Sequence, residues 1–168
     1  MAKTKVAEKK AVVPATKTTR EFKIGSKTIV VSNEDLICGG ILLVLVMIVH
    51  SIRSNFLGIP FERDEGIYSY FGTLVLEGKI PYKDFYEVKF PGLFYFFAMI
   101  VAMFGDTVEG MHTGFMWVNI LSMVFLYFAA RNLFSPVAGV ITALTFAFVS
   151  LTPNLSGFTV QSEQGVSF

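Results

Sequence analysis

The sequence predicts an all-α membrane protein, folded as a multi-pass helical bundle with an extracytoplasmic loop that carries juxtamembrane helices. Composition is the first observation behind this fold class: 53% of the 168 residues are hydrophobic, only 16% are charged, and the mean hydropathy is +0.59. The second is that the apolar residues are gathered into long runs instead of recurring with the period of an amphipathic helix or strand. Such runs are typical of membrane-spanning helices. The single cysteine, Cys38, permits no internal disulfide.

Basic residues are concentrated near the N-terminus, which predicts the orientation in the cell membrane. Residues 1–34 contain eight Lys or Arg and three acids, whereas residues 53–109 contain five and eight. Because cytoplasmic segments of membrane proteins are enriched in Lys and Arg, we expect a cytoplasmic N-terminus and an extracytoplasmic first loop. Residues 1–20 are rich in Lys, Ala and Thr and contain no aromatic residue. We therefore expect a disordered basic cytoplasmic tail over residues 1–31.

Three apolar runs are predicted to cross the membrane, at about residues 36–52, 111–130 and 137–151. Ser32 is placed to cap the first helix, with Glu34 and Asp35 in the first turn, where the helix dipole favours acids. A further run, residues 93–104, would form only about 18 Å of helix against a hydrocarbon core of about 30 Å, and we expect it to lie at the surface. Three crossings place the C-terminal segment outside. If residues 93–104 also cross, there are four spans and that segment is cytoplasmic.

The first outer loop, residues 53–110, contains a stretch that is dense in charge and flanked by apolar runs, Asp64–Gly92. Residues 65–77 are predicted to form an amphipathic helix on the membrane surface, because its apolar residues recur at helical spacing. The apolar face consists of Ile67, Tyr70, Phe71, Leu74 and Val75. Gly78 is placed to end this helix and Pro91 to begin the next one. Acids, lysines and tyrosines alternate along the stretch, a mixture that suits a polar substrate at a membrane face.

Several motifs of this stretch resemble one enzyme family. They are the acidic pair Asp64-Glu65 after the first membrane helix, the run Glu77-Gly-Lys-Ile-Pro-Tyr-Lys-Asp, and Lys89-Phe-Pro-Gly before an apolar segment that closes with Phe104-Gly105. This order resembles the N-terminal part of polyprenyl-phosphate-dependent glycosyltransferases of the GT-C type, the dolichyl-phosphate-mannose–protein mannosyltransferase-like enzymes. The resemblance covers about residues 36–168, roughly the first third of such an enzyme. We therefore interpret residues 32–168 as the N-terminal part of a GT-C-like transmembrane domain, and expect a fragment that is inactive alone.

The resemblance implies that a sugar is moved from a polyprenyl-phosphate carrier to an extracytoplasmic acceptor, which is a protein, a lipid or a glycan. It implies catalytic roles for Asp64 and Glu65, and substrate-binding roles for Lys89, Tyr82, Tyr86 and Glu163. The residue chemistry agrees, because an acceptor hydroxyl must lose a proton as the glycosidic bond forms, and a carboxylate can accept it. The departing lipid phosphate gains charge, which the cation of Lys89 can stabilise.

Each of these residues also has a structural interpretation. Asp64 could cap the helix that follows it, and Lys89 could anchor the loop among lipid headgroups. Tyr82 and Tyr86 could be aromatic residues of the membrane interface, and Glu163 an ordinary surface carboxylate. For the whole chain, the alternative function is a non-catalytic multi-pass membrane subunit or a transporter fragment. The membrane runs carry almost no ionisable residues, which favours chemistry at the surface over transport.

No cofactor follows from the sequence motifs. The chain lacks a Cys/His cluster, a P-loop and a dinucleotide-binding glycine pattern, so a soluble nucleotide-sugar enzyme is not indicated. The carboxylates leave a divalent cation open, since acidic residues are hard-metal ligands whether or not a metal is used. The expected partners are the lipid bilayer and the lipid-linked sugar donor, with no nucleic acid.

Overall fold

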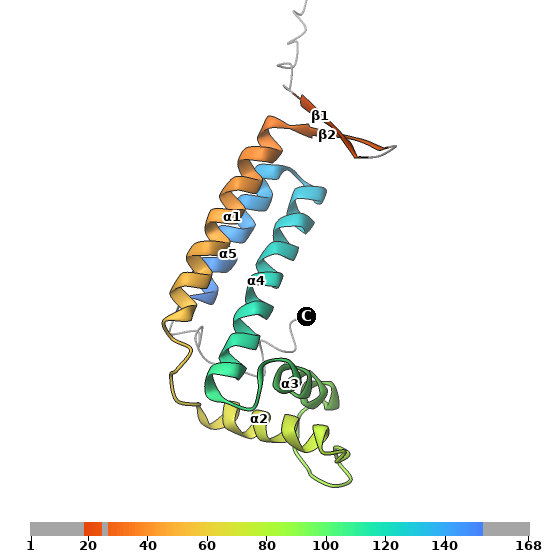
Figure 1. Ribbon diagram of the computed structural model, residues 1–168, viewed down its shortest axis with the longest axis vertical. Coiled ribbons are helices and arrows are strands. Elements are labelled where there is room, and N and C mark those ends of the chain that lie inside the picture. The colour runs from red at the N-terminus through yellow and green to blue at the C-terminus, as the bar shows by residue number, and fades with distance from the viewer. Residues whose placement is uncertain (1–18, 25–26, 153–168) are drawn as a thin grey trace, which may run out of the picture.

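The structure is a computed structural model and describes residues 19–24 and 27–152. Its elements are two strands, β1 (Thr19–Ile24) and β2 (Lys27–Ser32), followed by five helices: α1 (Asn33–Ser54), α2 (Arg63–Leu76), α3 (Pro91–Phe104), α4 (Val108–Leu133) and α5 (Pro136–Ser150). Helices thus form the main architecture of the described residues, as predicted. Figure 1 shows α1, α4 and α5 side by side along the long axis, with α2 and α3 gathered at one end.

The three long-axis helices share one apolar core. It is built from Cys38, Leu42 and Val49 of α1, Met116, Ile120, Met123 and Tyr127 of α4, and Ala143 and Ala147 of α5. The small residues of α5 allow it to pack closely. At Gly139 a Cβ atom would lie 2.8 Å from the Tyr127 carbonyl oxygen, so only glycine fits this crossing of α4 and α5.

Two arginines tie the bundle together at its two ends. At one end, Nε and Nη2 of Arg131 each lie 2.9 Å from Oδ1 of Asp35, near the start of α1. At the other end, Nη2 of the buried Arg53 donates to the carbonyl oxygen of Ser150, 2.7 Å away. A cation at the last turn of α5 satisfies a carbonyl that has no partner within the helix and complements the helix dipole. The start of α1 therefore shares one end of the bundle with the α4–α5 turn.

The α2 and α3 helices lie across the opposite end of the bundle (Figure 1). They pack on the start of α4 through a second apolar cluster: Tyr68, Leu93, Phe97, Ile100, Val101, Met111 and Phe115. The two helices approach closely at Gly72, where a Cβ atom would lie 2.9 Å from the carbonyl carbon of Phe97. We call α2, α3 and this second cluster the platform. The platform carries the charged residues of the predicted outer loop.

Helix bounds agree with the sequence predictions to within a few residues, because the end signals are local. Ser32 caps α1 with Asp35 in a capping box, Pro91 occupies the first turn of α3, and Gly78 follows α2 with a φ of 85°. Two of the helices, α1 and α4, are long and apolar enough to cross a membrane, while α3 and α5 are shorter apolar helices. Many large apolar side chains of α1 are exposed, Ile37 by 64% and Leu43 by 61%. An exposed apolar face of this size is typical of a lipid-facing helix.

The predicted disordered tail is wrong for the residues of the two strands. β1 and β2 pair antiparallel, from Thr19 opposite Ser32 to Ile24 opposite Lys27. The sequence carries the cause, because residues 28–31 are β-branched throughout, and the two segments are separated by Gly25-Ser26, a pattern that predicts a hairpin. Residues 1–18 lie outside the described residues, and the prediction for them stays open.

The predicted apolar face of α2 is only partly the buried one: Ile67 and Phe71 pack against the second cluster, but the fully buried residues are others. The helix buries Glu65, Tyr68, Ser69 and Gly72. Of the predicted face, Tyr70 is 60% exposed. The reason is the close contact with α3 at Gly72, because a helix turns its smallest side chains toward the partner that approaches nearest.

Candidate active site

The start of α2 places Asp64 on the surface of the platform. Glu62, two residues before Asp64, occupies the N-cap position, so the interpretation of Asp64 as the helix cap is wrong. Asp64 lies in the first turn with its side chain 54% exposed, and its Oδ1 is 3.8 Å from Nε of Arg63, which is 89% exposed. A pair so exposed contributes little to stability. The carboxylate of Asp64 is therefore open to a substrate, and it stands where the positive end of the helix dipole favours a negative charge.

Its neighbour Glu65 is completely buried, with 0% of its surface exposed. One carboxylate oxygen, Oε2, accepts a hydrogen bond of 2.8 Å from the backbone N–H of Glu62. The other, Oε1, lies 3.4 Å from Nε2 of His112 on α4. His112 is also buried, and its Nδ1 lies 2.8 Å from the carbonyl oxygen of Leu57. Glu65 was predicted as a catalytic residue, and the structure places it beneath Asp64, inside the protein.

Asp106, between α3 and α4, fastens the middle of α2. Its Oδ1 accepts from the hydroxyl of Ser69 and its Oδ2 from the hydroxyl of Thr73, both at 3.1 Å. Ser69 and Thr73 are one turn apart, so a single carboxylate reaches both hydroxyls. These contacts hold the middle of α2 against the segment between α3 and α4.

The segment between α2 and α3 is a turn that carries three further predicted residues, Tyr82, Tyr86 and Lys89. Oδ2 of Asp84 accepts from the backbone N–H of Ile80 at 2.8 Å, and the Asp84 N–H donates to the Ile80 carbonyl at 2.9 Å. Tyr82 adopts a φ of 65°, in the left-handed region, and its hydroxyl donates to the carbonyl oxygen of Lys89. The ring centroids of Tyr82 and Tyr86 lie 6.2 Å apart in an edge-on arrangement. The turn thereby holds the backbone of Lys89, whose own side chain is half-buried.

The predicted site residues thus fall into two groups. Asp64 and Glu65 lie at the start of α2, whereas Tyr82, Tyr86 and Lys89 lie in the turn beyond its end. The helix rises about 18 Å from Asp64 to its last residue, but the turn folds back, and the Phe85 ring stacks on Phe71 at 4.8 Å. Glu163 lies outside the described residues, so its predicted substrate-binding role is not tested.

His112 was missed at the level of sequence. It lies in an apolar run, and no spacing pattern relates it to Glu65 or Leu57, which are distant along the chain. The adjacent acids Asp64 and Glu65 point about 100° apart on a helix, which does not reveal that one of them is buried against His112.

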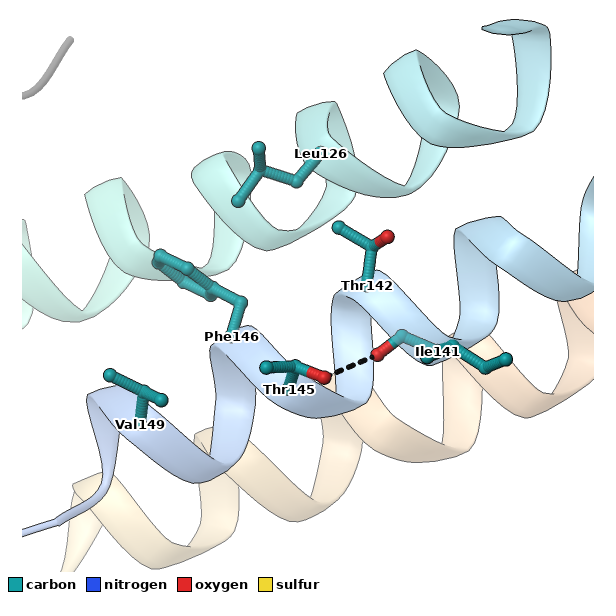
Figure 2. Close-up of a pocket in the computed structure, with 6 residues that line it drawn as sticks. All are labelled: Leu126, Ile141, Thr142, Thr145, Phe146 and Val149. Carbon is teal, nitrogen blue, oxygen red and sulfur yellow. Dashed lines mark hydrogen bonds between the residues drawn. The ribbon is translucent and has the colours of Figure 1, made fainter. Parts of the chain in front are cut away.

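A shallow groove of about 400 Å³ runs along α5, away from these residues. It is lined by Leu126 of α4 and by Ile141, Thr142, Thr145, Phe146 and Val149 of α5 (Figure 2). The Thr145 hydroxyl donates to the carbonyl of Ile141 at 2.9 Å within its own helix. The groove is therefore apolar, and its lining residues include no ionisable side chain.

The part of the chain that the structure describes contains no preformed metal site. Within residues 19–24 and 27–152, no group of three or more His, Cys, Asp or Glu lies close enough to hold an ion.

The fold and the site together define a class: a helical, membrane-associated protein whose exposed carboxylate stands on a platform at one end of an apolar bundle. Within this class, the family model described as dolichyl-phosphate-mannose-protein mannosyltransferase matches residues 88–163. This match agrees with the resemblance over these residues, which are less than half of the chain. It includes Lys89, α3, α4 and α5, whereas Asp64 and Glu65 precede it. No curated protein and no solved structure matches the chain.

Proposed function

We propose that this chain forms part of a membrane glycosyltransferase that transfers a sugar from a polyprenyl-phosphate carrier to an extracytoplasmic acceptor. The family match over residues 88–163 is the observation that carries this proposal. The exposed carboxylate at the start of α2 supplies the group that the reaction needs. The acceptor is a hydroxyl-bearing molecule, and the lipid bilayer delivers the donor.

Asp64 is the proposed general base. As the acceptor oxygen attacks the anomeric carbon, its proton passes to the Asp64 carboxylate, while the bond from that carbon to the phosphate oxygen breaks. The electron pair of this bond leaves with the polyprenyl phosphate. A base positioned in this way contributes roughly 10²–10⁴ to the rate. Glu65, which is buried under Asp64, has no contact with the substrate in this scheme.

Lys89 is the proposed partner of the departing phosphate. It lies two residues before α3, in a turn whose neighbouring side chains are exposed and aromatic or apolar: Tyr86 by 76%, Val88 by 83% and Phe90 by 74%. Such side chains suit the membrane interface, where the headgroup of a lipid-linked donor lies. At this depth a lysine amine can pair with the phosphate as its charge grows.

The proposed topology has three crossings, α1, α4 and α5, with the N-terminus in the cytoplasm. Placement of α2 and α3 across one end of the bundle supports a surface position for both helices (Figure 1). The loop acids Asp106 and Glu109 belong to that same end, and Arg131 to the other. The positive-inside rule counts basic residues, and residues 1–34 hold eight Lys or Arg against five in residues 53–109.

The test of Asp64 is its replacement by Asn in the full-length protein. Asp64→Asn keeps the shape and hydrogen-bonding capacity of the side chain but removes its basicity, so transfer of radiolabelled sugar from the lipid carrier should fall by roughly 10²–10⁴. Donor binding should stay unchanged. Glu77→Gln is the matched control, since Glu77 is an exposed acid at the other end of α2. Normal transfer by Asp64→Asn would remove the catalytic assignment.

The test of Lys89 separates binding from chemistry. Lys89→Met keeps the apolar stem and deletes the charge, so it should weaken binding of the polyprenyl-phosphate donor by roughly 10- to 100-fold, equivalent to about 1.5–3 kcal/mol. Transfer should slow as well. Lys83→Met, an exposed lysine in the same turn, is the control. Equal donor affinity in both variants would show that Lys89 serves only as an interfacial anchor.

A further inference from the structure

The buried pair Glu65 and His112 connects three segments that are far apart in the sequence. Through Leu57 it reaches the chain between α1 and α2, through Glu62 it reaches the N-cap of α2, and His112 itself belongs to α4. The ring of Phe61 closes one side of the imidazole, with its centroid 5.8 Å away in an edge-on arrangement. Glu65 and His112 are 0% and 6% exposed, and burying two such polar side chains costs free energy. We therefore expect this pair to perform a structural or catalytic role.

The hydrogen-bonding partners determine how protons are distributed in this pair. A carbonyl oxygen only accepts, so Nδ1 of His112 carries the hydrogen that it donates to Leu57. Nε2 faces a carboxylate oxygen at 3.4 Å, and two lone pairs at that distance repel. A proton therefore belongs to the pair, on Nε2 or on Oε1, and the pair as a whole is neutral. The contact lies at ion-pair distance without hydrogen-bond alignment, since Nε2 has no hydrogen-bond partner in the structure.

The geometry points to Glu65 and His112 as positioning residues that hold the carboxylate of Asp64 at the open face of the platform. Asp64 precedes Glu65 in the first turn of α2, so the orientation of that turn sets the direction of the Asp64 side chain. Glu65 fixes this turn through two contacts, from Oε2 to the Glu62 N–H and from Oε1 to His112. His112 in turn contacts the carbonyl oxygen of Leu57. This inference rests on the proposed function of Asp64 and adds the device that makes the base effective.

The variants distinguish hydrogen-bonding shape from charge. Glu65→Gln can still accept from the Glu62 N–H through its amide oxygen, and its NH₂ group can donate to Nε2 of a neutral His112, so both contacts and the neutrality persist. Glu65→Ala and His112→Ala remove one side of the pair. Glu65→Asp keeps the charge but is too short to reach both partners, and it serves as a milder variant if the alanine variants do not fold. Ser122→Ala is the control, because Ser122 is a buried polar residue of α4 that bonds only to its own helix, at the carbonyl of Val118.

Two readouts on the full-length protein test the inference. The first is steady-state sugar transfer: Glu65→Ala and His112→Ala should lower kcat by roughly 10²-fold, as a displacement of about 1 Å does, with the KM for donor changed less than about threefold. Glu65→Gln should keep kcat within about threefold, and Glu65→Asp should lose roughly tenfold. The second is amide hydrogen exchange of the peptide over residues 57–66, which should speed up in both alanine variants and stay unchanged in Glu65→Gln and Ser122→Ala.

Two results would overturn the inference. Loss of kcat in Glu65→Gln as large as in Glu65→Ala would mean that charge, rather than hydrogen-bonding shape, is what matters. Faster exchange in Glu65→Ala with unchanged kcat would mean that the pair holds the segment without positioning a catalytic group. The Asp64→Asn variant tests the proposed function separately from this inference. Normal sugar transfer by Asp64→Asn would overturn the role of Asp64. The amide exchange rates of the Glu65 and His112 variants would still report whether the pair holds the turn.

Discussion

The contact of α2 with α3 at Gly72 provides a quantitative test of the platform. A Cβ atom at Gly72 would lie 2.9 Å from the carbonyl carbon of Phe97 and 3.0 Å from the backbone nitrogen of Ala98, where ordinary contacts are 3.4–4 Å. Both neighbours are backbone atoms and cannot rotate away. Gly72→Ala therefore forces the two helices apart, which costs about 1–3 kcal/mol in a packed core.

Gly66 offers the matched control on the same helix. A Cβ atom there would meet only the Phe61 side chain, at 3.9 Å, which is an ordinary contact. Both substitutions gain helix propensity, up to about 1 kcal/mol each. Subtracting one result from the other removes this shared gain and leaves the packing cost alone. We expect Gly66→Ala to be neutral or stabilising, and Gly72→Ala to be less stable than Gly66→Ala by about 1–3 kcal/mol.

The measurement is the free energy of unfolding of each variant by reversible denaturant titration in mixed micelles. Amide exchange of α2 in Gly72→Ala should rise together with the loss of stability, because the hydroxyls of Ser69 and Thr73 move away from Asp106 when α2 shifts. Equal stability of the two alanine variants would refute the packing argument, since it would mean that α2 and α3 do not approach at Gly72 in the folded protein.

Three further predictions concern topology and long-range contacts. A double-mutant cycle on Asp35 and Arg131, whose side chains are 20% and 33% exposed, should give a coupling energy of about 1 kcal/mol, and a value of zero would contradict the pairing of these two helix ends. In a cysteine-free background, Glu109→Cys should react with an impermeant thiol reagent added outside the cell, and labelling only from the cytoplasm would reverse the proposed orientation. If Asp64 and Lys89 act on one donor, cysteines at these positions should be joined by a crosslinker of about 10 Å, because base and phosphate flank one anomeric carbon. Reaction only with spacers above about 20 Å would exclude a shared site.

The sequence by itself determined the helices and where they end. Ser32, Pro91 and Gly78 act within one turn of their own position, and an apolar run is recognisable without knowledge of its partners, so these features could be predicted. The hairpin of β1 and β2 could also have been recognised, because its signals are equally local: a β-branched segment and a two-residue Gly-Ser separation. The residue types expected at the outer loop, an exposed acid and a lysine before a proline, were likewise available from the chain.

Only the tertiary structure decided which of two adjacent acids faces the surface. Asp64 and Glu65 have the same charge and nearly the same shape, and their burial depends on where His112 arrives from α4. The face that α2 buries was also decided in this way, since the close approach of α3 selects Gly72 over the larger apolar side chains. Contacts of this kind join positions that are distant in the sequence, and they follow from the shape of the packed helices rather than from any local preference.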